Sequence, residues 1–111
     1  MKVYDLRRTA TQSERGESLL GFRDLQSHAC YMMYGVLRPG EEKRKIQPGK
    51  GHEEIILAIT GDIHVTGCTT GTLKEGFAFH IRGEEECFFH NTGESEVVYL
   101  IAGGHTEPKA H

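Results

Sequence analysis

The sequence predicts an all-β fold, a small barrel or sandwich of about eight to ten short strands. Fourteen glycines against three prolines in 111 residues indicate that the chain reverses direction often. Between these turn residues lie short runs rich in β-branched and aromatic side chains, which favour strands. No run gives a clear helical pattern. A chain of this length suits one domain with one core, which we place at residues 1–111.

The segment 52–60 gives the clearest strand. Three of the five residues at 55–59 are isoleucine, and the run is too short for a typical helix. A glycine stands at each side of the segment and indicates a turn there. The polar segment 41–47 lies between two further turns, so we interpret it as a strand that pairs antiparallel with 52–60.

The remaining elements follow the same pattern of short apolar runs between turns. Before the central strand we expect strands at 2–6, 19–25 and 28–38, with a loop or a single helical turn in the polar segment 9–18. After it we expect strands at 63–66, 77–81, 87–90 and 97–101. A polar tail, residues 103–111, opens with two glycines and is expected to be flexible.

Composition narrows the function classes. Thirteen basic and sixteen acidic residues give a net charge of -3, which offers no electrostatic footprint for nucleic acid or for an anionic membrane surface. No apolar run approaches the length of a membrane span, and the N-terminus has no apolar signal region. The cysteines, Cys30, Cys68 and Cys87, are odd in number and scattered, which does not resemble a disulfide framework. We therefore expect a cytoplasmic protein.

The order of turn and strand signals resembles the cupin family, small double-stranded β-helix or jelly-roll barrels. The first family motif is matched by Pro39-Gly40 and, further along the chain, by Glu54 and Gly61. Six residues lie between Glu54 and Gly61, as in the motif. The second family motif is matched by five positions in the segment 76–93: Gly76, Gly83, Cys87, Asn91 and Gly93. The resemblance covers about residues 34–102 and implies a cupin barrel of the small single-domain kind.

Cupins commonly hold a divalent metal with two histidines and a glutamate from the first motif and a histidine from the second. In this sequence only Glu54 stands at its expected position. Cys87 replaces the second-motif histidine. Neither of the two first-motif histidine positions holds a histidine. These positions lie among the following residues: Lys45, Ile46, Gln47, Pro48 and Lys50. The resemblance thus implies a degenerate metal motif.

His52 and Glu54 nevertheless share one face of a strand, and Cys87 would look across the barrel at Glu54. Imidazole, carboxylate and thiolate would suit a divalent metal such as Zn, Fe, Mn or Ni. In the alternative interpretation no metal binds. Cys87 is then a buried small hydrophobe, and Glu54 pairs with Lys45, Lys50 or His52.

The leading functional hypothesis is a pocket inside the barrel that binds a small, anionic molecule, without assignable catalysis. Its expected lining is Lys45, Gln47, His52, Glu54 and Cys87. One alternative is a metal-dependent enzyme, a dioxygenase, isomerase or lyase on a small organic acid. Another is a structural or regulatory dimer. The family resemblance implies a homodimer, for which the apolar segment 31–34 is the candidate interface.

The other histidines are not expected to be ligands. His64 and His80 alternate with apolar neighbours and should point outward, and His90 should face away from Cys87. His105 and His111 fall in the expected flexible tail, where we predict no coordinating role.

Overall fold

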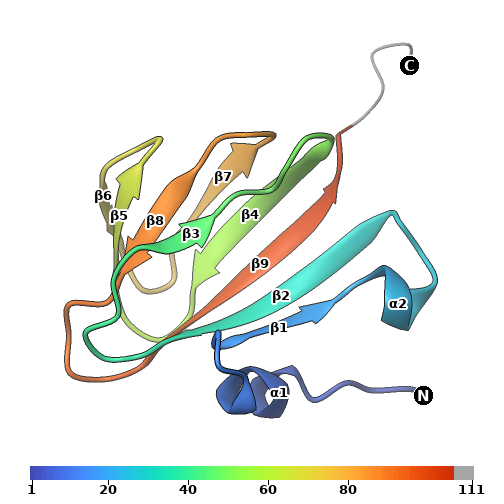
Figure 1. The fold of residues 1–111 in the computed structure, drawn as a ribbon, viewed down its shortest axis with the longest axis horizontal. Helices are drawn as coiled ribbons and strands as arrows, with labels where there is room; N and C mark the ends of the chain where they lie inside the picture. The colour runs from blue at the N-terminus through green and yellow to red at the C-terminus, as the bar shows by residue number, and fades with distance from the viewer. Residues whose placement is uncertain (107–111) are drawn as a thin grey trace.

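The computed structural model describes residues 1–106, which fold into two antiparallel β-sheets that face each other (Figure 1). The larger sheet has the strand order β1-β2-β9-β4-β7, and the smaller has the order β3-β8-β5-β6. The bounds are β1 Glu17–Leu20, β2 Cys30–Leu37, β3 Arg44–Ile46, β4 His52–Ala58, β5 Ile63–Gly67, β6 Gly71–Leu73, β7 Ala78–Arg82, β8 Cys87–His90 and β9 Val97–His105. The all-β prediction is confirmed.

Two short helices precede and follow β1. The first overlaps the segment 9–18, where a helical turn was one of the two expectations, but it begins earlier. The segment expected as a strand at 2–6 leads instead into α1, Leu6–Gln12. The Asp5 carboxylate accepts a hydrogen bond of 3.0 Å from the Arg8 amide and thereby caps the first turn of this helix. The segment 19–25 leaves β1 at Gly21 and turns into α2, Phe22–Leu25. Within residues 1–106 neither helix has the length and hydrophobicity needed to cross a bilayer.

The expected pairing of 41–47 with 52–60 is wrong. β3 pairs with β8 in the smaller sheet, whereas β4 lies between β7 and β9 in the larger one. The connection at 47–51 carries the chain from one sheet to the other, and Gly49 and Gly51 adopt φ values of 95° and 83° there. Sequence neighbours therefore become the two opposing walls of the barrel. The short strand β6 was not among the expected strands.

β9 extends further than expected. Residues 103–105 were expected to be flexible, yet they form the end of a strand that pairs with β2 on one side and β4 on the other. This strand lies inside the sheet, so both of its edges are hydrogen bonded. The expectation for the rest of the tail, His111 included, falls outside the described residues.

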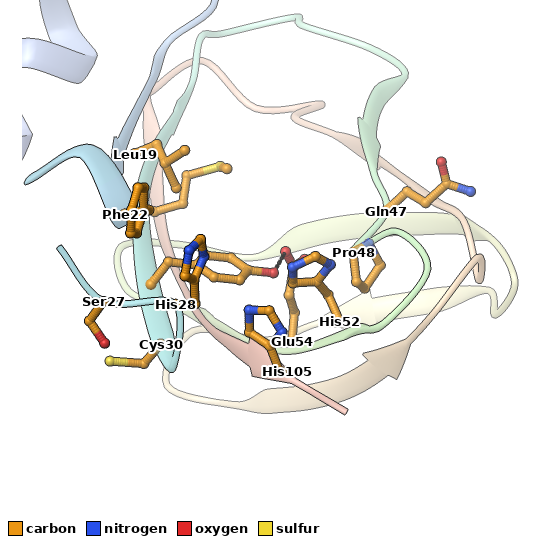
Figure 2. A pocket seen from close by; sticks show the side chains of 13 residues that line it. Leu19, Phe22, Ser27, His28, Cys30, Gln47, Pro48, His52, Glu54 and His105 are labelled. Atoms are coloured by element: carbon orange, nitrogen blue, oxygen red, sulfur yellow. Dashed lines mark hydrogen bonds between the residues drawn. The ribbon is translucent and has the colours of Figure 1, made fainter. Parts of the chain in front are cut away.

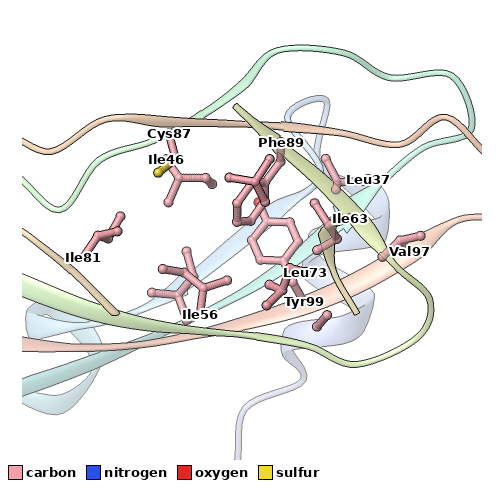
Figure 3. Close-up of a cluster of buried hydrophobic side chains, with 13 residues drawn as sticks. Leu37, Ile46, Ile56, Ile63, Leu73, Ile81, Cys87, Phe89, Val97 and Tyr99 are labelled. Carbon is pink, nitrogen blue, oxygen red and sulfur yellow. The ribbon is translucent and has the colours of Figure 1, made fainter. Parts of the chain in front are cut away.

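The core fills the space between the sheets at one end of the barrel (Figure 3). Phe89 packs edge-on against Tyr99, with ring centroids 5.3 Å apart. The buried side chains share the inner faces of both sheets: Leu37, Ile46, Ile56, Ala58, Ile63, Val65, Leu73, Ile81, Cys87, Phe89, Val97, Tyr99 and Ile101. Along β2, β4 and β9 these residues occupy one end only. The inner face at the other end, near His52 and His105, carries polar groups.

The cysteine prediction is corrected by a disulfide between Cys68 and Cys87, whose Cα atoms are 5.4 Å apart. The β5–β8 register places Gly67 opposite Cys87, so Cys68 follows directly beside its partner. The two cysteines are 19 residues apart in the sequence, so their proximity could not be predicted from the local pattern. Because two of the three cysteines are bonded to each other, the cysteines do not indicate a reducing compartment, and a cytoplasmic location stays a prediction.

Candidate functional site at the open end of the barrel

The site is organised by one row of residues across three neighbouring strands. Glu54 on β4 lies opposite Gly103 on β9, which lies opposite Tyr31 on β2. The Tyr31 ring lies flat over Gly103, where a Cβ would overlap it. Its hydroxyl thereby reaches the next strand and donates to Glu54 Oε2 at 2.5 Å. We call Glu54, Gly103 and Tyr31 the mouth row.

Burial governs the protonation of the mouth row. Glu54 is only 6% exposed, and this burial raises its pKa above the usual range, while the Tyr31 hydrogen bond and the charge of His52 act in the opposite direction. Burial, followed by the Glu54 hydrogen bond and charge, also raises the pKa of Tyr31. The phenol therefore stays protonated at neutral pH and remains a donor.

Histidines gather around Glu54 of the mouth row (Figure 2). His52 and His105 are direct cross-strand partners on β4 and β9, with ring centroids 4.8 Å apart. His28, which follows α2, lies edge-on to His105 with centroids 6.2 Å apart and stacks on Phe22 at 3.9 Å. Three separate segments thus place imidazoles around one opening.

These groups line a cavity of about 340 Å³ at the open end of the barrel. This volume suits a small organic molecule. One wall is apolar and includes Leu19, Phe22, Met33 and Pro48. The polar part of the lining is formed by Ser27, His28, Cys30, Tyr31, Gln47, His52, Glu54 and His105.

The structure brings three of the expected site residues together and separates the other two. Gln47, His52 and Glu54 line the cavity. Lys45 points to the other face of β3 and pairs with Glu86 at 3.2 Å, although it also borders a smaller adjoining cavity shared with Gln47 and Glu54. Cys87 is fully buried in the core and bonded to Cys68, so it does not line this cavity.

The expected partners of Glu54 also differ. The sequence suggested Lys45, Lys50 or His52, but the hydrogen bond comes from Tyr31. His64 and His80 do point outward, as predicted, and His90 lies on the opposite face from Cys87. His105, which the sequence assigned to a flexible tail, lies instead at the end of β9 against His52. Tyr31, His28 and His105 are the site residues that sequence reasoning missed.

A metal at the family position does not fit this donor set. The residue that replaces the second-motif histidine, Cys87, is in a disulfide and cannot act as a thiolate. The segment that should supply the histidine pair presents the buried Ile46 to the interior. Across residues 1–106, no three His, Cys, Asp or Glu side chains already surround a single point.

Comparison with known proteins identifies the fold. No protein-family model and no curated protein sequence matches the chain. A cupin 2 conserved barrel domain protein from Salinispora arenicola superposes with a TM-score of 0.72 at 12% identity, covering 96% of this chain and 90% of that one. The cupin domain of Schizosaccharomyces pombe Cnp3 gives 0.62 at 19% identity, covering 70% and 54%. An oxalate oxidase structure gives 0.69 at 17% identity, covering 86% and 54%.

The chain is therefore a small cupin-fold protein. It spans about half the length of the Cnp3 domain and the oxalate oxidase chain, and nearly all of the Salinispora protein. Its neighbours include enzymes and proteins of other kinds, so the fold leaves the function to the residues of the open end.

Proposed function

We propose that the protein binds a small anionic organic molecule, such as a carboxylic acid, in the cavity at the open end of the barrel. The observation that carries this proposal is the convergence of His28, His52 and His105 on a cavity with an apolar wall. Imidazoles donate hydrogen bonds and gain positive charge in mildly acidic solution, which favours a carboxylate ligand.

The remaining polar groups are compatible with the same ligand class. The only carboxylate in the lining, Glu54, is engaged by Tyr31 and biased by burial toward its neutral form. Gln47 borders the cavity, but its amide points away from the histidines and donates to the Glu84 carbonyl oxygen at 2.9 Å, so we assign it no contact with the ligand (Figure 2). The adjoining cavity has Arg15 and Lys45 on its border together with Glu17 and Glu54, and Lys45 is paired with Glu86, so it adds no excess of positive charge. We assign no catalytic step to this arrangement.

A ligand screen by thermal unfolding tests the proposal. The panel pairs small mono- and dicarboxylic acids with neutral amides of equal size, in buffer containing a metal chelator. We expect at least one acid to raise Tm by mass action, and the shift to be lost in His52→Ala and kept in His64→Ala. The proposal fails if no acid at millimolar concentration shifts Tm, or if the two variants respond alike.

The metal-dependent enzyme is not carried forward, because its ligand set required Cys87 as a thiolate. The homodimer remains as a second proposal, with a revised interface. Tyr31 and Met33 face the cavity, so only the alternate residues of the segment 31–34 are available outside. On that outer face Met32, Ala102 and Ile55 form a row, and Met32 and Ile55 are 39% and 52% exposed.

We propose that two copies pair through this outer face of the larger sheet. Size-exclusion chromatography with light scattering, at concentrations from micromolar to hundreds of micromolar, should give a dimer. Ile55→Lys should dissociate it, whereas Phe77→Lys, which alters an exposed side chain beyond this row, should not. A wild-type protein that stays monomeric throughout the range contradicts the proposal.

A further inference from the structure

The His52–His105 pair has the placement of two ligands to one metal ion. The residues are directly opposite on adjacent antiparallel strands, so their side chains leave the sheet on the same face. Their ring centroids are 4.8 Å apart. Two imidazoles bound to one Zn²⁺ at about 2.0–2.1 Å per nitrogen have ring centroids about 5 Å apart in tetrahedral geometry. The pair therefore fits one ion with little movement.

The ring nitrogens of this pair are uncommitted. Among residues 1–106, His52 and His105 make no side-chain hydrogen bond, and neither does His28. The second cross-strand pair, His64 and His90, is different. There the Nδ1 atom of His90 accepts from the Lys43 amide at 3.2 Å, and Nε2 lies 2.9 Å from Thr66 Oγ1. His90 would have to lose a hydrogen bond to bind an ion.

His28 can complete the set. Its ring centroid is 6.2 Å from that of His105, about 1 Å beyond the spacing that a shared tetrahedral ion requires. His28 is exposed and follows the end of α2, so a side-chain rotation can supply this movement. This distance is consistent with the finding that three ligands do not yet surround one point in residues 1–106.

We propose that His28, His52 and His105 form a transition-metal site at the mouth of the barrel, with neutral imidazole ligands suited to Zn²⁺ or Ni²⁺. The fourth position faces the cavity and is open to water or to a bound molecule. The ligands come from the α2–β2 connection and from the ends of β4 and β9. This set shares no residue with the Glu54 and Cys87 positions at which the family motif places its ligands.

Isothermal titration of the untagged 111-residue chain with ZnCl₂, after removal of metal by a chelator, tests the site. We expect one Zn²⁺ per chain. His52→Ala and His105→Ala should each weaken binding by about tenfold or more, and His28→Ala should weaken it less. His64→Ala serves as the matched control and should leave the affinity unchanged.

Two results would overturn the site: no binding of Zn²⁺ by the wild-type chain, or equal losses in His52→Ala and His64→Ala. His111→Ala is included because that histidine belongs to the same chain, and loss of binding in this variant alone also contradicts the assignment. Circular dichroism of each variant separates lost ligands from lost folding. Substitution with Co²⁺ gives an independent readout, because a tetrahedral site produces visible absorption that His105→Ala should remove.

This proposal uses the same three histidines as the proposed site for the organic ligand, and the two experiments separate the two kinds of binding. The carboxylate screen is done with a chelator present, and the Zn²⁺ titration is done without any organic acid. Failure of one experiment therefore leaves the other interpretable.

Discussion

Two rows of the same composition cross the inner face of the larger sheet, and they have opposite surroundings. Each joins a glutamate, a glycine and a tyrosine on three neighbouring strands, with the tyrosine ring lying over the glycine. The mouth row is Glu54–Gly103–Tyr31, and the second, which we call the core row, is Glu17–Gly35–Tyr99. In the core row Tyr99 donates to Glu17 at 3.0 Å.

The difference lies in the positive groups that each row meets. At the core row Arg44 lies 3.3 Å from the Tyr99 hydroxyl and is held by Glu41 at 2.6 Å. Burial lowers the pKa of Arg44, but the neighbouring Tyr99 and Glu41 more than compensate, and the guanidinium stays charged. The cavity lining at the mouth row contains histidines and no arginine or lysine. An ion pair stabilises one end, whereas the polar lining of the other end consists of histidines, Glu54 and uncharged groups.

The largest expected effect comes from adding a methyl group to the glycine of each row. Tyr99 is fully buried, so Gly35→Ala cannot displace its ring without disturbing the core, and we expect a loss of about 3 kcal/mol in unfolding free energy. Tyr31 borders the cavity and can rotate away, at the expense of its hydrogen bond to Glu54, so Gly103→Ala should cost about 2 kcal/mol. Urea unfolding of both variants measures the difference.

The Gly103→Ala variant carries its own check. If Tyr31 rotates, the hydrogen bond to Glu54 is lost, and the environment of the Tyr31 ring should change in NMR spectra while the core signals of Phe89 stay constant. A loss for Gly103→Ala as large as that for Gly35→Ala would show that the mouth row is as rigid as the core row.

Removal of the tyrosine hydroxyls should give intermediate effects with different pH dependence. Tyr31→Phe leaves the buried Glu54 without its donor, and we expect a loss of about 2 kcal/mol at pH 7 that shrinks at pH 4, where Glu54 takes up a proton. Tyr99→Phe removes the donor to Glu17, which is only partly buried, so we expect about 1 kcal/mol with little change between pH 7 and pH 4.

Stability curves in urea at the two pH values measure both variants. Equal pH dependence for Tyr31→Phe and Tyr99→Phe would remove the electrostatic contrast between the two rows. A larger loss for Tyr99→Phe than for Tyr31→Phe at pH 7 would mean that the partly buried Glu17 depends on its donor as strongly as Glu54 does.

Most of the strands and the inward-facing side of β4 could be predicted from the sequence, because both follow from local patterns. Alternating residues set the inward direction of Glu54, and the spacing from Glu54 to Gly61 matched the fold. The partners of Glu54 could not be predicted in this way. Tyr31 reaches it only because Gly103 lies between them in the sheet, and that register joins segments 23 residues apart or more.

The histidine cluster was missed for the same reason. His105 was assigned to a flexible tail because two glycines precede it, and glycine weakens a strand interior. In the folded chain Gly103 is where the Tyr31 ring packs, so the residue that suggested disorder is part of the site. The available signal was the combination of a glycine in one strand with an aromatic residue in a neighbouring strand, since such a ring can pack over the glycine. The Cys68–Cys87 pair likewise depends on the β5–β8 register.

The smallest effect concerns Glu54 itself and tests whether burial dominates its protonation. Its pKa is raised in the folded chain relative to the unfolded value, so folding favours the protonated form. This contribution is complete below the unfolded pKa of about 4.3 and is lost as the pH rises through the folded pKa. Glu54→Gln keeps an oxygen for the Tyr31 hydroxyl but carries no charge.

The free energy of unfolding of Glu54→Gln, relative to wild type, should therefore increase from pH 4 to pH 8 by on the order of 1 kcal/mol. Comparing the same pair of proteins across pH cancels any constant packing cost of the amide. Glu53→Gln, which alters a half-exposed carboxylate paired with His80 on the outer face, provides the matched control. Urea unfolding with a chelator present measures the trend without metal. A difference that falls with pH would mean that Tyr31 and His52 outweigh burial and that Glu54 is held as a carboxylate, which would weaken the proposal of an anionic ligand in the cavity.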